Sequence, residues 1–163
     1  MEYRSICPSP IGDLTLVCND TGLSQVSLLP RPDLTLQNGH PLLSQARQWL
    51  DRYFLGKTPN PAELPLHPQG TAYQKYVWAQ LLTIPWGESR SYGQLAQEIT
   101  AQTGTPTSPR AIGAAVGKNP LWILIPCHRV LGAKGQLTGY AGGIENKMWL
   151  LRHEGIPFKE EIR

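Results

Sequence analysis

The stretch SYGQLAQEITAQTGTPTSPRAIGAAVG, residues 91–117, decides which fold the second half of this chain can adopt. Ser91 followed by Gln94 has the form of a capping box, in which two side chains satisfy the free amides at a helix start. Apolar residues then recur at helical spacing as far as Ile99. Ser108-Pro109 supplies a cap and a first-turn proline for another helix, which Gly117 ends. Two short helices joined by a turn predict a helix-turn-helix.

Helices are predicted on both sides of this motif. Thr71 and Gln74 form a second capping box ahead of a helix that runs to Leu82 and stops at Pro85-Trp86-Gly87. A last helix covers about residues 144–154. Between the motif and this last helix, the apolar run 119–125 predicts a strand-like segment that leads into Pro126-Cys127-His128-Arg129.

The first half has a different pattern. Alternating apolar residues predict strands at 14–18 and 23–29, and apolar residues three or four apart from Pro41 to Phe54 predict a helix. Prolines crowd the stretch 58–70, which reads as a linker. We therefore expect two domains, 1–70 and 71–163: an α/β domain with a small antiparallel sheet plus a helix, followed by a mainly α domain with the helix-turn-helix.

Composition and charge indicate where the protein is located and what kind of partner it binds. The 163-residue chain has no apolar run of the ~20 residues needed to cross a bilayer and no signal-peptide pattern, so we expect a cytoplasmic protein with no membrane partner. Its three cysteines would then be free thiols. Residues 1–70 carry a net charge of −1 and residues 71–163 one of +4, which favours the second half as the place where a polyanion docks.

Cys127 is the candidate for chemistry. A thiol attacks as the thiolate, and the adjacent His128 and Arg129 are groups that lower a thiol pKa. From composition alone, however, a buried core thiol remains the better-supported interpretation. Cys7 and Cys18 lack such neighbours and are interpreted as core residues.

Other kinds of site find no support in the sequence. There is no Cys-x-x-Cys or His-x-x-x-His spacing, so no metal site is expected. The run from Gly113 to Asn119 has three residues between its glycines and Asn after the lysine, whereas a phosphate-binding loop needs four and Ser or Thr. No G-x-G-x-x-G follows a strand, and no cofactor is expected.

Taken together, several motifs resemble the O6-alkylguanine-DNA alkyltransferases, also called methylated-DNA–protein-cysteine methyltransferases. The motifs lie between about Tyr73 and Gly155, and the N-terminal seventy residues match only in general form. They are PWG (85–87) before SY (91–92), RAIGAAVGKNP (110–120), IPCHRV (125–130), YAGG (140–143) and KMWLLRHEG (147–155). The resemblance implies a ribonuclease-H-like N-terminal domain. It also turns the catalytic interpretation of Cys127 into the expected one.

The resemblance implies DNA repair by single-turnover, irreversible transfer of an alkyl group from O6-alkylguanine, and also from O4-alkylthymine, to Cys127. His128 would deprotonate the thiol through a water, and Glu154 would orient the imidazole. Asn119 would hold the segment before the cysteine. Tyr92 would rotate the damaged nucleotide out of the duplex and donate a proton to the departing guanine. The expected partner is double-stranded DNA, bound by a monomer through the minor groove.

Two further sets of residues are implied by the same resemblance. Arg110 would fill the space left by the flipped base, and Arg129 would support the backbone. The expected DNA-binding residues are Arg110, Tyr92, Ala111, Gly113, Ala114 and Lys118, and the expected base pocket consists of Tyr140, Ala141, Gly142, Val130 and Trp122. Ala141 stands where some relatives have serine. The connection through residues 100–107 is longer than usual, and no zinc-ligand pattern is present.

Two alternatives stay open at this point. A non-catalytic relative would bind alkylguanine and recruit other repair factors, but such proteins usually have tryptophan in place of the cysteine. A cysteine hydrolase would use Cys127 and His128 directly, but neighbours on one strand point to opposite faces. Transfer of a label to the protein, lesion binding without transfer, and steady turnover of an ester distinguish the three.

Overall fold

The computed structural model describes residues 1–160 and forms two compact units. One unit comprises residues 1–69 with the short return segment Pro120–Trp122, and the other comprises residues 70–119 and 123–160. Within the described residues, no helix is both long and apolar enough to span a membrane. The cytoplasmic location stays a prediction.

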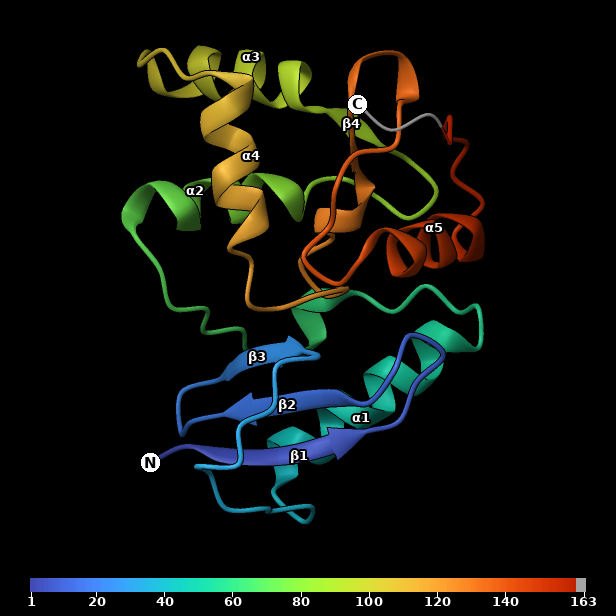
Figure 1. The fold of residues 1–163 in the computed structure, drawn as a ribbon. Coiled ribbons are helices and arrows are strands. Elements are labelled where there is room, and N and C mark those ends of the chain that lie inside the picture. The colour runs from blue at the N-terminus through green and yellow to red at the C-terminus, as the bar shows by residue number, and fades with distance from the viewer. Residues whose placement is uncertain (161–163) are drawn as a thin grey trace. The chain divides into compact units, whose positions relative to one another are not determined.

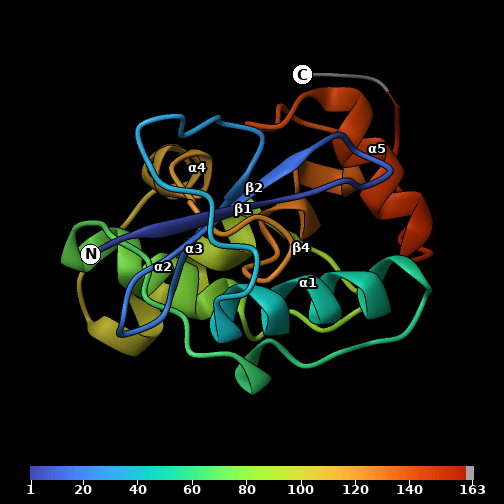
Figure 2. The same ribbon diagram turned by 90° about the horizontal axis from the view of Figure 1, so that it is seen from below.

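The N-terminal unit is an antiparallel sheet with a helix on one face (Figures 1 and 2). Its strands lie in the order β1-β2-β3, and the residues of β2 and β3 are all buried. The predicted sheet-plus-helix architecture is confirmed, although the sequence pattern missed β1. The elements are β1 (Tyr3–Cys7), β2 (Leu14–Cys18), β3 (Leu23–Ser27), α1 (Pro41–Phe54) and the 3-10 turn η1 (Pro61–Glu63).

Helix α1 begins and ends as its sequence dictates. His40 caps it by accepting a hydrogen bond from the amide of Leu42, and Pro41 occupies the first turn, where its missing N–H costs nothing. Gly56 follows the end with φ +86°, a left-handed conformation that glycine adopts without strain. The apolar face of α1 is buried and comprises Leu43, Ala46, Trp49, Leu50 and Tyr53.

The proline-rich stretch is part of this unit rather than a free linker. The amide of Leu23 donates to Pro65 O at 2.8 Å, and the amide of His67 donates back to Leu23 O at 2.7 Å. A Cβ on Gly22 would lie 2.7 Å from Pro65 O, so this close approach requires glycine.

The predicted strand-like run 119–125 is shorter and more irregular than its pattern indicates. Leu121 forms one parallel bridge with Val26, whose amide donates to Pro120 O at 2.9 Å. The chain then turns at residues 122–124, where Ile123 has φ +73°. An apolar run of this length does not distinguish a strand from a buried turn, because both bury every side chain.

The C-terminal unit contains the predicted helix-turn-helix (Figure 1). Helix α4 packs against both α3 and α2. Both capping boxes form, at Thr71 and at Ser91, and Gly104 ends α3 with φ +72°. The elements are α2 (Ala72–Leu81), β4 (Arg90–Ser91), α3 (Tyr92–Thr103), α4 (Pro109–Gly117), η2 (Cys127–Arg129), β5 (Val130–Leu131), η3 (Ala133–Gly135) and α5 (Ile144–His153).

The connection between α3 and α4 is shorter than the sequence suggested, because α3 continues through Thr103 and only residues 104–108 separate it from α4. Tyr73 and Thr107 join their hydroxyl oxygens at 2.6 Å, and the Tyr76 hydroxyl donates to Gln102 Oε1 at 2.8 Å. The first bond joins the connection to α2, and the second joins the last turn of α3 to α2.

A two-residue parallel pairing brings the start of α3 beside the segment that follows the cysteine. Arg90 pairs with Val130, and Ser91 pairs with Leu131. Tyr92 therefore begins its helix next to the strand that continues directly from the Pro-Cys-His-Arg turn. No local sequence pattern predicts that two segments this short and this far apart in the chain will pair.

Trp78 links α2 to α4, and its replacement tests this core. Its side chain is buried, and its Nε1 donates to Ala115 O at 2.9 Å. Trp78→Phe removes this bond, leaves Ala115 O with the amide of Lys118 as its donor at 3.1 Å, and puts a smaller ring in a buried space. We therefore expect a loss of about 1–3 kcal/mol in the free energy of unfolding. Urea denaturation measures it. Tyr76→Phe, which removes an exposed hydrogen bond, is the control, and an equal loss in both variants would contradict the expectation.

Candidate active site

Cys127 sits in the short turn η2, and its backbone is fixed from the preceding segment. The Asn119 side chain donates from Nδ2 to Ile125 O at 2.8 Å. The left-handed backbone of Ile123 is uncommon for a β-branched residue and stores roughly 1–3 kcal/mol of strain, which the surrounding bonds must offset. Cys127 itself is only 3% exposed. Its position is therefore determined by the turn that Asn119 holds closed.

A buried carboxylate joins the two residues that follow Cys127. His128 Nε2 lies 2.6 Å from Glu154 Oε2, and Arg129 Nε lies 2.7 Å from Glu154 Oε1. Arg129 also donates from Nη1 to Ile84 O at 2.5 Å. The imidazole and the carboxylate are fully enclosed. Three residues from two distant segments thus form one buried network.

The protonation of this network follows from its electrostatics. Burial raises the pKa of Glu154, but hydrogen bonds and charge from His128 and Arg129 outweigh it and lower that pKa to about 2. Burial lowers the pKa of His128, although Glu154 opposes the change. At neutral pH the carboxylate is charged and the imidazole is neutral. Because a carboxylate only accepts, His128 carries its hydrogen on Nε2 and leaves Nδ1 as an acceptor.

That second ring nitrogen is placed to take a proton. Among the described residues, His128 Nδ1 is buried and has no hydrogen-bond partner. A buried polar atom without a partner costs stability unless water or a ligand satisfies it. His128 is thus arranged as a neutral general base: Glu154 holds its Nε2, and its Nδ1 can accept a proton.

The thiol of Cys127 is neutral at rest. Burial raises its pKa, while the neighbouring polar groups of Asn119 and Tyr140 and the charge of Lys147 lower it in part. A neutral buried thiol reacts slowly, so this site needs a base to form the thiolate.

Lys147 is a buried cation that the sequence reasoning missed. It is 1% exposed, and its Nζ donates to Val130 O at 2.7 Å, to Thr138 Oγ1 at 2.9 Å and to Gly139 O at 3.5 Å. Burial lowers its pKa to about 8, although the nearby Cys127 opposes the change. Its position three residues after Ile144 and four before Leu151 places it on the apolar face of α5, which is the signal that could have found it.

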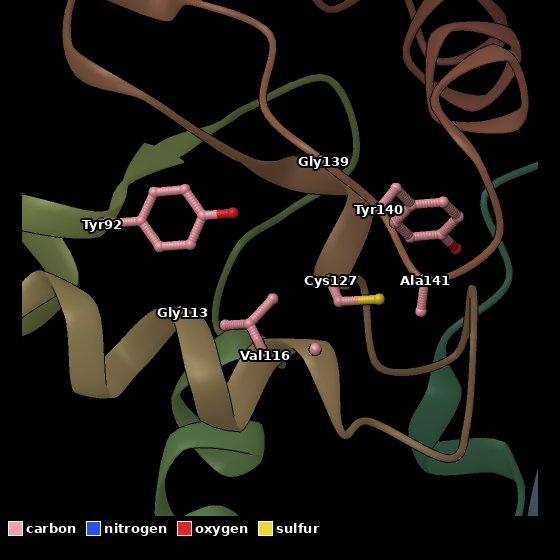
Figure 3. Close-up of a pocket in the computed structure, with 8 residues that line it drawn as sticks. Tyr92, Gly113, Val116, Cys127, Gly139, Tyr140 and Ala141 are labelled. Carbon is pink, nitrogen blue, oxygen red and sulfur yellow. The ribbon is translucent and has the colours of Figure 1, made fainter. Parts of the chain in front are cut away.

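A cavity of about 420 Å³ opens onto the thiol. Figure 3 shows the Cys127 sulfur directed toward Tyr140 and Ala141, with Tyr92 across the cavity. Its volume falls in the usual range for small-ligand pockets. The lining residues are Tyr92, Gly113, Val116, Gly117, Cys127, Gly139, Tyr140 and Ala141.

The cavity brings together two of the five residues predicted for the base pocket, and the base pocket itself stays a prediction. Tyr140 and Ala141 line the cavity, but Gly142, Val130 and Trp122 do not. Val130 is fully buried behind the site, Gly142 O accepts from Asn146, and Trp122 belongs to the N-terminal unit. Proximity to the cysteine in the sequence suggested these residues. The cavity instead takes part of its wall from α4, which sequence reasoning had assigned only to DNA.

The predicted DNA-binding residues lie along α4 and its end. Arg110, Ala114 and Lys118 are exposed, Ala111 is half-buried, and Gly113 lines the cavity. A Cβ on Gly113 would contact the Tyr92 ring at 3.6 Å, so the ring packs closely over this glycine. The helix therefore presents polar ends and small residues outward.

No group of metal-binding side chains is found in the described part of the chain. Cys7 and Cys18 are buried, and burial raises the pKa of both thiols, that of Cys18 to about 11. These two thiols are far less able to form thiolates than a surface cysteine.

Comparison with known proteins identifies relatives of both units. Residues 72–156 match the model of the 6-O-methylguanine DNA methyltransferase, DNA binding domain, and residues 2–68 match that of the 6-O-methylguanine DNA methyltransferase, ribonuclease-like domain. The methylated-DNA–protein-cysteine methyltransferase of Mycobacterium tuberculosis strain H37Rv is 45% identical over 159 residues, covering 94% of this chain and 92% of the relative. That of Methanosarcina acetivorans is 41% identical over 159 residues, covering 94% and 98%. The structure of Mycobacterium tuberculosis OGT in complex with DNA matches with a TM-score of 0.82 at 42% identity, covering 93% of this chain and 92% of that chain.

The buried carboxylate predicts a distinct acid sensitivity. Because the folded pKa of Glu154 lies below its ordinary value of 4.5, its stabilisation is present above that pH and is lost as the pH falls toward 2. The shift corresponds to about 3 kcal/mol. His128 acts in the same direction, since its lowered pKa makes folding less favourable below pH 6.5. Urea denaturation between pH 7 and pH 3 measures both effects.

The variant Glu154→Gln separates the carboxylate from other acid effects. It leaves the charge of Arg129 without its partner, so we expect a loss of about 3–5 kcal/mol at pH 7 and a shallower decline below pH 5. Glu145→Gln, exposed on α5, is the matched control and keeps the wild-type decline. An unchanged slope in Glu154→Gln would assign the acid sensitivity to other groups.

Proposed function

The chain belongs to the 6-O-methylguanine DNA methyltransferase family, and we propose that it repairs O6-alkylguanine in DNA by transferring the alkyl group to Cys127. The observation that carries this proposal is a buried thiol at a cavity, followed directly by a neutral histidine held by an ionised glutamate. In this proposal the C-terminal unit is the DNA-binding and catalytic domain, and the N-terminal unit is a structural domain.

The reaction begins with proton removal from Cys127. A water bridging the thiol and His128 Nδ1 satisfies that unpaired nitrogen and carries the proton to it. The imidazolium that results is stabilised by Glu154 at 2.6 Å. The charge of Lys147 and the polar groups of Asn119 and Tyr140 favour the thiolate.

The thiolate then attacks the alkyl carbon and displaces the guanine oxygen. The sulfur–carbon bond forms as the carbon–oxygen bond breaks, and Tyr92 gives the departing guanine a proton. The thioether is stable, and neither a cofactor nor a residue that hydrolyses it takes part. Each molecule therefore acts once. O4-alkylthymine presents the same type of alkyl–oxygen bond and is proposed as a second substrate.

The alkylated base must leave the duplex to reach this thiol. The Tyr92 ring, packed over Gly113, rotates the nucleotide outward, and exposed Arg110 fills the gap. The small residues of α4 suit a close approach to the minor groove, with Ala111, Ala114 and Lys118 beside the DNA. The base then occupies the cavity between Tyr140, Ala141 and α4, where the backbone amide of Ala141 takes the role of the serine found in some relatives.

Transfer to Cys127→Ala is the direct test. The wild-type protein, incubated with DNA that carries labelled O6-methylguanine, should gain one methyl group on Cys127 by mass spectrometry of the intact protein and its peptides. Cys127→Ala should gain none but still bind the lesion in a gel-shift assay, because the cavity remains.

The control Cys7→Ala should be methylated like the wild type. Absence of label on the wild-type protein, with the lesion and the thiol verified, would falsify the proposal. Lesion binding without transfer would favour a non-catalytic binding protein, and release of unlinked product with turnover would favour a hydrolase.

Arg110→Ala tests base flipping separately from chemistry. We expect it to slow transfer from double-stranded DNA by about 10- to 100-fold, since stacking and pairing energy of a few kcal/mol is no longer offset. Reaction with a free O6-alkylguanine base, which needs no flipping, should keep its rate. Single-turnover kinetics with both substrates measure this. Arg52→Ala, an exposed arginine of the N-terminal unit, is the control. Equal slowing with free base and DNA would place Arg110 in the chemical step instead.

A further inference from the structure

A threonine outside the proposed machinery connects two of its members. Thr138 Oγ1 lies 3.1 Å from the Tyr92 hydroxyl and 2.9 Å from Lys147 Nζ. The residue lies in the segment between η3 and α5, one position before Gly139 of the cavity wall. Its methyl group packs on Gly132, where an added Cβ would lie 3.2 Å from Thr138 Cγ2. Thr138 therefore holds one position between the phenol and the buried cation.

The direction of these hydrogen bonds follows from which atoms can donate. A charged lysine has three hydrogens and no acceptor, so Thr138 Oγ1 accepts from Lys147. Within the described chain, Tyr92 and Lys147 are the side-chain partners of the Thr138 hydroxyl. If Tyr92 donated to Thr138, the threonine hydrogen would have no side-chain acceptor among the described residues. When Thr138 donates to Tyr92 instead, every hydrogen has a partner or faces the cavity.

This direction leaves the phenolic hydrogen of Tyr92 free to point elsewhere. Figure 3 shows the Tyr92 hydroxyl reaching across the cavity toward the segment of Gly139 and Tyr140. A phenol whose oxygen already accepts a hydrogen bond is also a better donor, because hydrogen bonds in a chain polarise one another. The cation thus acts on the phenol through one intervening hydroxyl.

We propose that Thr138 is a positioning residue for alkyl transfer: it accepts from Lys147 and donates to Tyr92, and so directs the Tyr92 hydrogen toward the departing guanine. This inference rests on the proposed function. It adds a residue that neither holds the thiol nor touches the alkyl group. It also gives Lys147 a second role, on the leaving-group side of the cavity.

The proton balance of the step is closed. As sulfur–carbon bond formation breaks the carbon–oxygen bond, the electron pair stays on the guanine, which takes the proton from Tyr92. The phenolate that remains accepts the hydrogen of Thr138, whose oxygen is in turn bonded to the ammonium of Lys147. Solvent returns a proton to Tyr92 when the base leaves. No oxidant, reductant or cofactor enters.

The electrostatics of Tyr92 agree with this geometry. Burial raises the pKa of its phenol, the Thr138 hydrogen bond lowers it, and the Cys127 thiolate raises it. Loss of the threonine hydroxyl would therefore make Tyr92 a weaker acid at the moment when the leaving group needs a proton.

Two reactions of the same thiol separate positioning of Tyr92 from general damage to the site. Methyl transfer from O6-methylguanine in DNA expels a base that needs a proton. Alkylation of Cys127 by iodoacetamide expels iodide, which needs none. The variants are Thr138→Val, which keeps the shape and removes the hydroxyl, and Thr138→Ser, which keeps the hydroxyl. Peptide mass spectrometry follows Cys127 apart from the other thiols.

We expect Thr138→Val to slow methyl transfer about tenfold or more and to leave the iodoacetamide rate within about twofold of the wild type. Thr138→Ser should recover most of the methyl-transfer rate. In a Tyr92→Phe background, Thr138→Val should cause no further slowing, because the group it directs is absent. Carbon-13 NMR of labelled tyrosine, with Tyr92→Phe as the assignment control, should show a raised Tyr92 pKa in Thr138→Val.

Several results would overturn the inference. Unchanged methyl transfer in Thr138→Val would do so, as would equal slowing of both reactions, which would mean that the threonine supports the thiol or the fold. Additive slowing in the Tyr92→Phe background would separate Thr138 from Tyr92. If the wild-type protein transferred no methyl group, the proposed function would fail, while the pKa of Tyr92 in the two threonine variants would still test the hydrogen bond.

Discussion

The Glu154 carboxylate is the charge on which the rest of the site depends. It is buried, and its two oxygens receive one hydrogen bond each from His128 and Arg129, at 2.6 and 2.7 Å. A buried ion is stable only where such partners replace water, and Arg129 supplies the compensating charge. Arg129 also bonds Ile84 O. One carboxylate at the end of α5 thus ties together the turn that carries the thiol and the segment that follows α2.

This network sets the protonation of the site before any substrate enters. A permanently ionised Glu154 forces the His128 hydrogen onto Nε2 and leaves Nδ1 to act as a base. The thiol and imidazole both remain neutral because burial disfavours their charged forms. Lys147, whose pKa is about 8, supplies the positive charge that a thiolate requires. The resting cysteine is therefore a neutral, weakly nucleophilic thiol, and the base His128 and the cation Lys147 that favour its thiolate lie close to it.

The parts of the molecule that follow from local sequence rules were predictable, and those that depend on distant pairings were not. The caps at Thr71, Ser91 and Ser108 form as expected, because each involves residues within one helical turn. The β4–β5 pairing joins residues forty apart, and no local pattern encodes it. The lining of the cavity illustrates the same limit: Val130 and Trp122 are close to Cys127 along the chain but do not line it, whereas Gly113 and Val116 reach it from a distant helix.

The slim helix α4 shows why its sequence contains residues that weaken helices. It spans nine residues, and two of its glycines line the cavity while Arg110 and Ala114 face outward. Glycine within a helix costs about 1 kcal/mol relative to alanine. Larger side chains at these two positions would remove that cost but would extend into the cavity. The low helix propensity of α4 is therefore the cost of a thin wall beside the thiol, and its packing against α2 and α3 holds it in helical form.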